Sequence, residues 1–205
     1  MKRLGEMSVG EVAAYVAEHL RQSDINVVLT GGSCVSIYTD NRYLSYDLDF
    51  IEEGRSTRKK IAACLREIGF QEKDRYFTHT DTRFFVEFPS GPLAIGDEPV
   101  GNIALLEFAT GTLRLLSATD CVKDRLANYY HWKDRQCLDQ AIMVAADAEV
   151  DLEEVERWSR HEGMTEEFER IKELLKRAFP GTAFQPADQH QSRYPDCPMN
   201  GNRTE

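Results

Sequence analysis

The hydrophobic pattern of the first 116 residues switches between helical and strand-like spacing. Ser8 and Glu11 have capping-box spacing, and apolar residues then recur at helical intervals to about residue 24. The run 25–30 is short, apolar and β-branched, which indicates a strand that ends at Gly31-Gly32. By the same reasoning we predict helices over 33–38 and 56–67, and strands over 43–51, 76–78, 84–88, 93–95, 103–108 and 113–116.

From Ser117 onward the pattern is helical throughout. Four helices are predicted, with capping residues at Ser117, Asp134, Asp151 and Thr165. Residues 181–205 are polar, contain three prolines and show no apolar period, so we expect a disordered tail. The predicted organisation is an α/β unit with a mixed sheet over 1–116, a helical region over 117–180, and the tail over 181–205.

The composition indicates a protein of the cytoplasm. Hydrophobic residues make up 41% and charged residues 29% of the 205 residues, as in ordinary globular proteins. The sequence has no apolar stretch of the roughly 20 residues that cross a bilayer, and its first residues lack the apolar segment of a secretory signal. The five cysteines are scattered and odd in number, which favours reduced thiols over a disulfide framework or a zinc site.

The net charge of −10 bears on whether the protein binds nucleic acids. Residues 147–173 contain eleven Asp or Glu and four Lys or Arg, a balance of −7. An acidic surface repels a phosphate backbone, so extensive non-specific nucleic-acid binding is not expected. A small basic pocket for one triphosphate, or for the end of one RNA, remains compatible with this charge.

Two short motifs carry candidate chemistry. Gly31-Gly32-Ser33 joins a predicted strand to a predicted helix, where free backbone N–H groups and the helix dipole favour an anion. An ordinary loop is the alternative.

The second motif is Asp47 and Asp49, which lie two positions apart on a predicted strand, so both side chains project from one face. Paired carboxylates of this kind suit Mg²⁺ or Mn²⁺, whereas solvated aspartates on a strand edge are the alternative. The apolar neighbours, including Tyr46, favour a buried strand and therefore the metal.

Taken together, these motifs resemble the nucleotidyltransferase superfamily whose best-known member is DNA polymerase beta. The family pattern is a strand, Gly-Gly-Ser or Gly-Gly-Thr, a short helix, and Asp-x-Asp on the next strand. Arg42 and Ser45 resemble residues that precede the aspartates in the branch of bacterial abortive-infection toxins, although one extra residue lies between them here. The segment that begins at Ser117 and contains Lys123 also resembles that branch. The similarity covers roughly residues 25–146.

The resemblance implies an α+β fold: a nucleotidyltransferase-like mixed β-sheet with flanking helices, followed by a C-terminal helical bundle. It implies a third carboxylate from a later strand, for which Glu87 is the best candidate because it is a lone acid in an apolar strand. Asp81 and Asp97 are alternatives, although aspartate is common at turns. Glu87 as an outward-facing strand residue also remains open.

The implied reaction transfers a nucleoside monophosphate from a nucleoside triphosphate to an acceptor. Metal-binding and catalytic roles fall to Asp47, Asp49 and Glu87, with Mg²⁺ or Mn²⁺ as cofactor. Nucleotide contacts fall to a second set, with Arg83 in support: Gly31, Gly32, Ser33, Arg42, Ser45 and Lys123. The acceptor could be RNA such as tRNA, a protein or a small molecule, and the toxin branch implies an antitoxin partner. The alternatives are a catalytically inactive member of this fold that binds a nucleotide or a partner, and an interaction protein with chance motifs.

Overall fold

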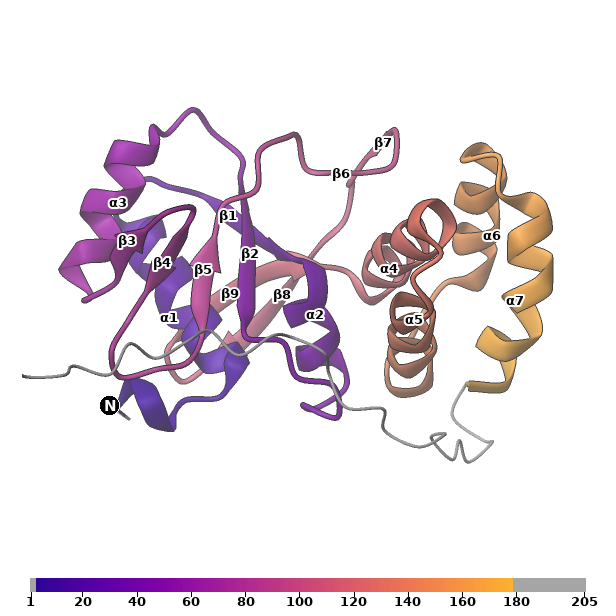
Figure 1. The fold of residues 1–205 in the computed structure, drawn as a ribbon, viewed down its shortest axis with the longest axis horizontal. Helices are drawn as coiled ribbons and strands as arrows, with labels where there is room; N and C mark the ends of the chain where they lie inside the picture. Colours follow the sequence, from indigo (N-terminus) through magenta and orange to yellow (C-terminus); the bar gives the residue numbers. More distant parts are fainter. Residues whose placement is uncertain (1–2, 179–205) are drawn as a thin grey trace, which may run out of the picture.

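The computed structural model describes residues 3–178, which form a seven-stranded mixed sheet and a group of helices (Figure 1). The strands in spatial order are β3 (Gln71–Lys73), β4 (Tyr76–Thr78), β5 (Phe85–Glu87), β2 (Asp47–Glu52), β1 (Val27–Thr30), β9 (Gly111–Leu116) and β8 (Ile103–Phe108). The pairs β1–β9 and β2–β5 are parallel, and the other neighbours are antiparallel. A separate hairpin pairs β6 (Ala94–Ile95) with β7 (Glu98–Pro99).

Four helical segments are interspersed with these strands. They are the 3₁₀ helix η1 (Leu4–Glu6), α1 (Val9–Gln22), α2 (Gly31–Tyr38) and α3 (Arg58–Glu67). The predicted capping box is confirmed at α1, where the Ser8 side chain accepts from the Glu11 N–H and the Glu11 side chain accepts from the Ser8 N–H. Helix α1 packs against β9, β1 and β8, and α3 packs against α1 and β3.

The remaining helices follow the last strand, on one side of the sheet in Figure 1. They are α4 (Ala118–Trp132), α5 (Arg135–Asp147), α6 (Leu152–His161) and α7 (Thr165–Ala178). The predicted N-caps at Ser117, Asp134 and Asp151 are confirmed. Helix α2 contacts α4 and α5, and the indole N–H of Trp158 in α6 donates to the carbonyl of Ile95 in β6 at 3.2 Å. One buried hydrophobic cluster therefore includes residues of the sheet and of the helices.

The predicted fold class, a mixed sheet with flanking helices and C-terminal helices after it, is confirmed. Two of the predicted boundaries that differ lie at the candidate site. Helix α2 begins at Gly31 rather than at residue 33, and β2 begins at Asp47 rather than at residue 43. Strand β2 begins where its pairing with β5 begins, with Asp47 opposite Phe85. Tyr46, expected in a buried strand, lies before this pairing and is 38% exposed.

The short strands β3 and β7 were not predicted, because each has only two or three residues, with exposed or half-buried side chains. The predicted tail over 181–205 lies outside the described residues. Within residues 3–178, no helix has the combined length and apolar character that a bilayer span requires. The cysteines in this range are free and buried.

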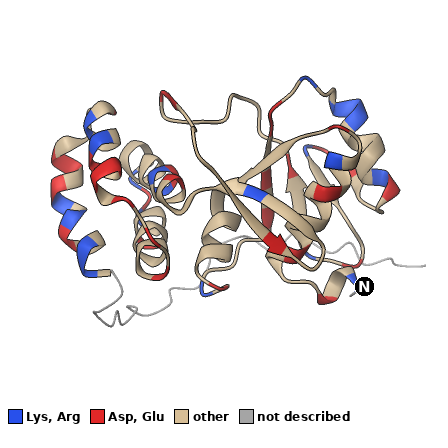
Figure 2. Ribbon diagram, turned by 180° about the vertical axis from the view of Figure 1, so that it is seen from behind, with Lys and Arg blue, Asp and Glu red and all other residues tan. Residues whose placement is uncertain are grey.

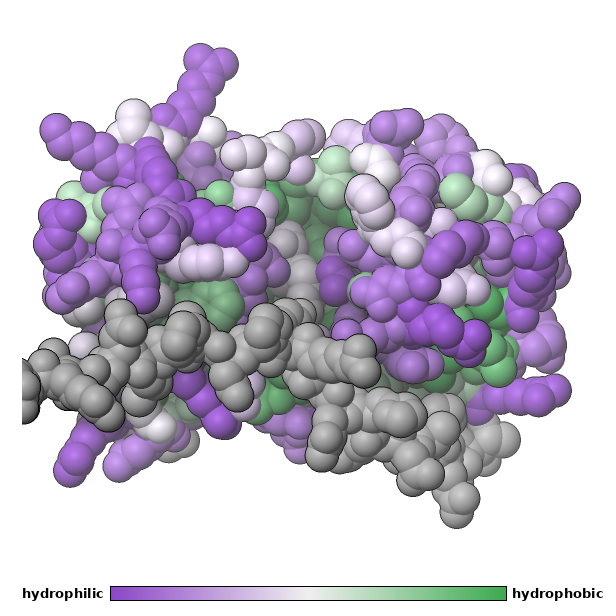
Figure 3. All heavy atoms as spheres, viewed as in Figure 1, coloured by the Kyte–Doolittle hydropathy of each residue, from purple (hydrophilic) through white to green (hydrophobic). Residues whose placement is uncertain are grey.

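Charge and hydropathy are unevenly distributed over the surface. Helices α6 and α7 carry intermixed acidic and basic residues (Figure 2), and ion pairs such as Lys172–Glu156, at 2.7 Å, join the two helices. Much of the acidic charge in this segment is therefore locally paired. The space-filling view shows hydrophilic residues over the outer surfaces and hydrophobic residues in the recess between the sheet and the helices (Figure 3).

Candidate metal centre and nucleotide site

The centre of the candidate site is the first half of β2. Alternation along this strand buries Leu48 and Phe50 completely and leaves Asp47 and Asp49 half-buried on the opposite face. The two aspartates therefore project side by side, as the i, i+2 spacing predicts. The strand lies centrally in the sheet, with β1 on one side and β5 on the other, so both backbone positions are fixed by neighbours.

Strand β5 supplies a third carboxylate. It runs parallel to β2 with Asp47 opposite Phe85 and Asp49 opposite Glu87, so Glu87 projects from the same face as the aspartates. One oxygen from each of these three carboxylates lies within 4.8 Å of the other two. We call Asp47, Asp49 and Glu87 the triad. Asp81 lies near the cavity described below, and Asp97 lies in the β6–β7 turn, where its N–H donates to Glu162 at 3.1 Å.

The electrostatics of the triad disfavour three ionised carboxylates. Burial, followed by repulsion from Asp49 and Glu87, raises the pKa of Asp47 from 3.8 to about 7. Burial and repulsion from Glu87 likewise raise the pKa of Asp49 to about 6. The Oδ1 atom of Asp47 is buried and has no hydrogen-bond partner among the described residues. An orphaned carboxylate oxygen beside two further carboxylates fits a hard divalent cation such as Mg²⁺ or Mn²⁺.

The glycine turn lies directly against the triad. Gly31 has a φ of +69°, a conformation that L side chains rarely adopt, and a Cβ at this position would overlap Oδ2 of Asp49. A Cβ at Gly32 would lie 3.2 Å from Oγ of Ser45. Because Gly31 carries no side chain, the backbone of the turn can approach the Asp49 carboxylate closely. The N–H groups of the first turn of α2 lack intrahelical acceptors and are available to an anion.

Three serines fix the turn to β2. The hydroxyl of Ser33, which is completely buried, donates to the carbonyl of Asp47. The N–H of Ser45 donates to Oγ of Ser36 at 2.8 Å, and the N–H of Asp47 donates to Oγ of Ser45 at 3.3 Å. In this structure, therefore, the hydroxyls of Ser33 and Ser45 bind the backbone of the strand that carries the aspartates.

Comparison with known proteins gives similar folds at low identity. An antigenic nucleotidyltransferase-like protein from Paracoccidioides brasiliensis has a TM-score of 0.53 and 14% identity, over 82% of this chain and 92% of that one. The chain has a nucleotidyltransferase-like fold.

Two structures of the antibiotic-resistance factor ANT(2'')-Ia also match. The solution structure has a TM-score of 0.47 and 13% identity, over 82% of this chain and 94% of that one. The complex with adenylyl-2''-tobramycin has a TM-score of 0.46 and 12% identity, over 77% of this chain and 95% of that one. No family model and no curated protein matches the sequence.

Within this nucleotidyltransferase fold, two predicted nucleotide-binding residues have carboxylate partners. Arg42 follows α2 and forms an ion pair with Asp147 at the end of α5. Lys123 is buried in α4, with its Nζ 3.0 Å from Asp120 and 2.6 Å from Glu154. The positive charge of each side chain is therefore compensated within the protein.

Two arginines that the sequence analysis did not assign to the site act on the triad. Arg75, in the β3–β4 turn, has its Nε 3.3 Å from Oε1 of Glu87. Arg125 of α4 is mostly buried, pairs with Asp124, and is close enough to Asp49 to oppose the rise of its pKa. The sequence gives little sign that Arg75 lies near Glu87. Their proximity depends on the pairing of β4 with β5, which brings Tyr76, the residue after Arg75, opposite Glu87.

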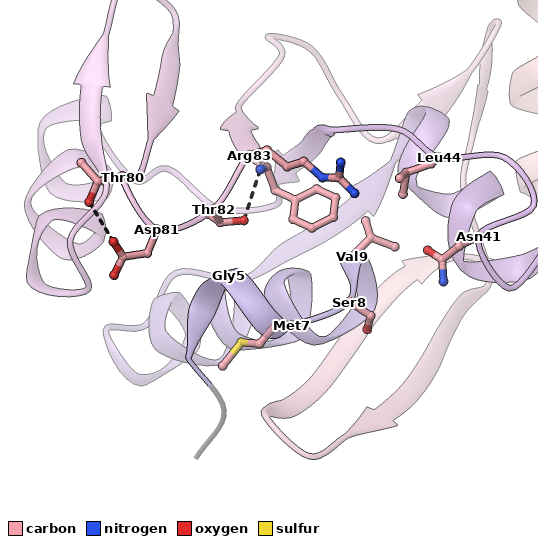
Figure 4. A pocket seen from close by; sticks show the side chains of 11 residues that line it. Gly5, Met7, Ser8, Val9, Asn41, Leu44, Thr80, Asp81, Thr82 and Arg83 are labelled. Atoms are coloured by element: carbon pink, nitrogen blue, oxygen red, sulfur yellow. Dashed lines mark hydrogen bonds between the residues drawn. The ribbon is translucent and has the colours of Figure 1, made fainter.

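The nucleotidyltransferase fold also carries two cavities that the triad does not line. A cavity of about 640 Å³ lies between the start of α1, the α2–β2 loop and the loop before β5. In Figure 4, Arg83 points across it toward Leu44 and Asn41; its guanidinium also lies 4.5 Å from the ring centre of Tyr46. Arg83, predicted to support the triphosphate, is thus placed at this cavity. A second cavity, of about 390 Å³, is lined by Lys123 and by residues of the β6–β7 hairpin and α6.

Proposed function

We propose that this protein is a divalent-metal-dependent nucleotidyltransferase. The reaction transfers a nucleoside monophosphate from a nucleoside triphosphate to an acceptor: an acceptor oxygen bonds to the α-phosphorus, and pyrophosphate leaves. The observation that supports this proposal most strongly is the triad, three carboxylates within 4.8 Å of one another on adjacent strands, beside a glycine turn that opens a helix. The resemblance of Gly31-Gly32-Ser33 and Asp47-x-Asp49 to the superfamily pattern supports it independently.

The triad residues would hold Mg²⁺ or Mn²⁺ through their carboxylate oxygens. When bound, such ions neutralise charge on the triphosphate and lower the pKa of an attacking hydroxyl. Metal binding would also remove the repulsion among the three carboxylates and satisfy the orphaned Oδ1 of Asp47. Glu87, the carboxylate contributed by β5, would serve the acceptor side of the site.

The glycine turn would hold the triphosphate. Its backbone N–H groups at the start of α2 suit the β- and γ-phosphates. Ser33 and Ser45 would contribute indirectly, because their hydroxyls hold the backbone of Asp47. Arg42 and Lys123 would have to leave their carboxylate partners to reach a phosphate. We therefore assign the main phosphate contacts to the turn.

The acceptor is RNA, a protein or a small molecule, and its identity decides the biological role. The resemblance to abortive-infection toxins favours a toxin that is held in check by an antitoxin. That role predicts growth arrest when the wild-type protein is expressed alone, and no arrest with the Asp47→Asn variant. Growth of both cultures at equal expression would count against a toxin without affecting the proposed chemistry.

The chemistry itself is tested with α-³²P-labelled nucleoside triphosphates. The purified protein is incubated with each nucleotide, Mg²⁺ or Mn²⁺, and total RNA, protein extract or aminoglycosides as acceptors. Label transferred to one pool, and lost with Asp47→Asn, is the expected result. Asp97→Asn is the matched control, because Asp97 is an exposed turn aspartate away from the triad. The proposal fails if Asp47→Asn transfers label as well as the wild type, or if no metal promotes nucleotide binding.

A further inference from the structure

Arg75 is the exposed cation beside the triad. It follows Asp74, which has a left-handed φ of +56°, in the turn that joins β3 to β4. Its guanidinium lies 4.7 Å from the ring centre of Tyr76 and donates to the hydroxyl of that residue. Because Tyr76 lies opposite Glu87 in the β4–β5 pairing, the ring directs the guanidinium toward the triad. The contact between Nε of Arg75 and Oε1 of Glu87, at 3.3 Å, follows from this arrangement.

Arg75 and Arg125, the arginines introduced above, differ in exposure. Arg75 reaches the triad at Glu87, through the 3.3 Å contact of its Nε with Oε1 of that carboxylate. The side chain of Arg125 is 13% exposed and paired with Asp124. The side chain of Arg75, by contrast, is 68% exposed and can move away without opening the core.

We propose that Arg75 is a displaceable counter-cation of the triad, which pairs with Glu87 in the metal-free protein and gives way when a divalent ion binds. The inference rests on the proposed function in one respect, that a divalent ion binds the triad. A cation entering there must break the Arg75–Glu87 pair and meets repulsion from the guanidinium. Arg75 therefore weakens metal binding, holds Glu87 in place without metal, and is not required for the fold.

The test is a titration of metal-free, full-length protein with Mn²⁺, without nucleotide, at pH 8. Free Mn²⁺ is followed by electron paramagnetic resonance. Arg75→Ala removes the charge, and Arg75→Lys keeps it on a different head group. Arg21→Ala is the matched control, because Arg21 is likewise an exposed arginine, 60% exposed, that pairs with a half-buried carboxylate, Glu18 at 2.7 Å, and it lies in α1 rather than in the β3–β4 hairpin.

We expect Arg75→Ala to bind Mn²⁺ about two- to fivefold more tightly than the wild type, the range that exposed ion pairs usually give. Arg75→Lys should lie near the wild type, and Arg21→Ala should equal it. Equal or weaker Mn²⁺ binding by Arg75→Ala, with wild-type circular dichroism, would overturn the inference and leave the proposed function standing. Failure of all four proteins to bind Mn²⁺ would also overturn the inference, and the labelled-nucleotide assay then decides the proposed function.

Discussion

Asp47→Asn should make the metal-free protein more stable, although it removes a residue at the centre of the site. In the wild type, this carboxyl is half-buried, faces Asp49 and Glu87, and has one oxygen without a partner. An aspartate whose folded pKa is raised stabilises the fold only when protonated. The stability is therefore present at low pH and is lost as the pH rises from the unfolded value toward the folded one. Asparagine does not carry this pH-dependent cost.

The magnitude follows from the size of the shift. The pKa of Asp47 rises from 3.8 to about 7, and each pKa unit corresponds to about 1.4 kcal/mol, which gives an upper limit of about 4 kcal/mol above pH 7. The amide of asparagine is buried in the same place with few partners, which costs about 1–3 kcal/mol. The expected net gain is roughly 1–3 kcal/mol, or roughly 2–10 °C in the melting temperature of a protein of this size.

The assay is thermal unfolding in EDTA at a series of pH values, with Asp97→Asn as the control. The gap between Asp47→Asn and the wild type should open between about pH 4 and pH 7 and stay constant above, because the difference in bound protons is confined to that interval. Added Mn²⁺ should then stabilise the wild type more than the variant. If Asp47→Asn melts at or below the wild-type temperature at pH 8 in EDTA, the ionised Asp47 carboxylate does not destabilise the metal-free fold, and the reasoning is refuted.

Three further outcomes follow from the same geometry. Gly31→Ala should lower stability by about 1–2 kcal/mol and abolish nucleotide transfer, because it strains a left-handed backbone and displaces Asp49; wild-type turnover would contradict this. Ser33→Ala should weaken Mn²⁺ binding and destabilise the fold by about 0.5–1.5 kcal/mol, since it removes the shorter of the two hydroxyl hydrogen bonds to the Asp47 carbonyl; calorimetry measures both. Mn²⁺ affinity of the wild type should fall by about tenfold or more from pH 8 to pH 5.5, because protons compete for carboxylates whose pKa is raised; a flat titration series would exclude that competition.

Local rules predicted the paired aspartates and the glycine turn, and the family resemblance added the third carboxylate. Alternation on a strand places Asp47 and Asp49 on one face. The resemblance implied an acid from a later strand, and Glu87 was preferred to Asp81 and Asp97 because it is a lone acid in an apolar strand. The helix N-caps depend on spacing within four residues and were predicted for the same reason. None of these predictions requires knowledge of which strands pair.

Features that depend on pairing between distant segments were missed. The start of β2 depends on where its pairing with β5 begins, and the position of Arg75 depends on β4 lying beside β5. The partners of Lys123 come partly from α6, 31 positions along the chain, so a lysine that pattern alone assigns to a phosphate is found between carboxylates. Such contacts arise from tertiary packing, which local periodicity does not encode.

The parallel pairing of β2 with β5 has a consequence for how this protein can change. The triad carboxylates come from two strands whose relative register brings Asp49 opposite Glu87. A one-residue insertion within either strand would turn its carboxylate to the opposite face. The connection over residues 53–84 carries no triad residue, but it includes α3, β3 and β4, and β4 pairs with β5. New segments can therefore be accommodated only in the turns between these elements, where they leave the register of β2 with β5 unchanged.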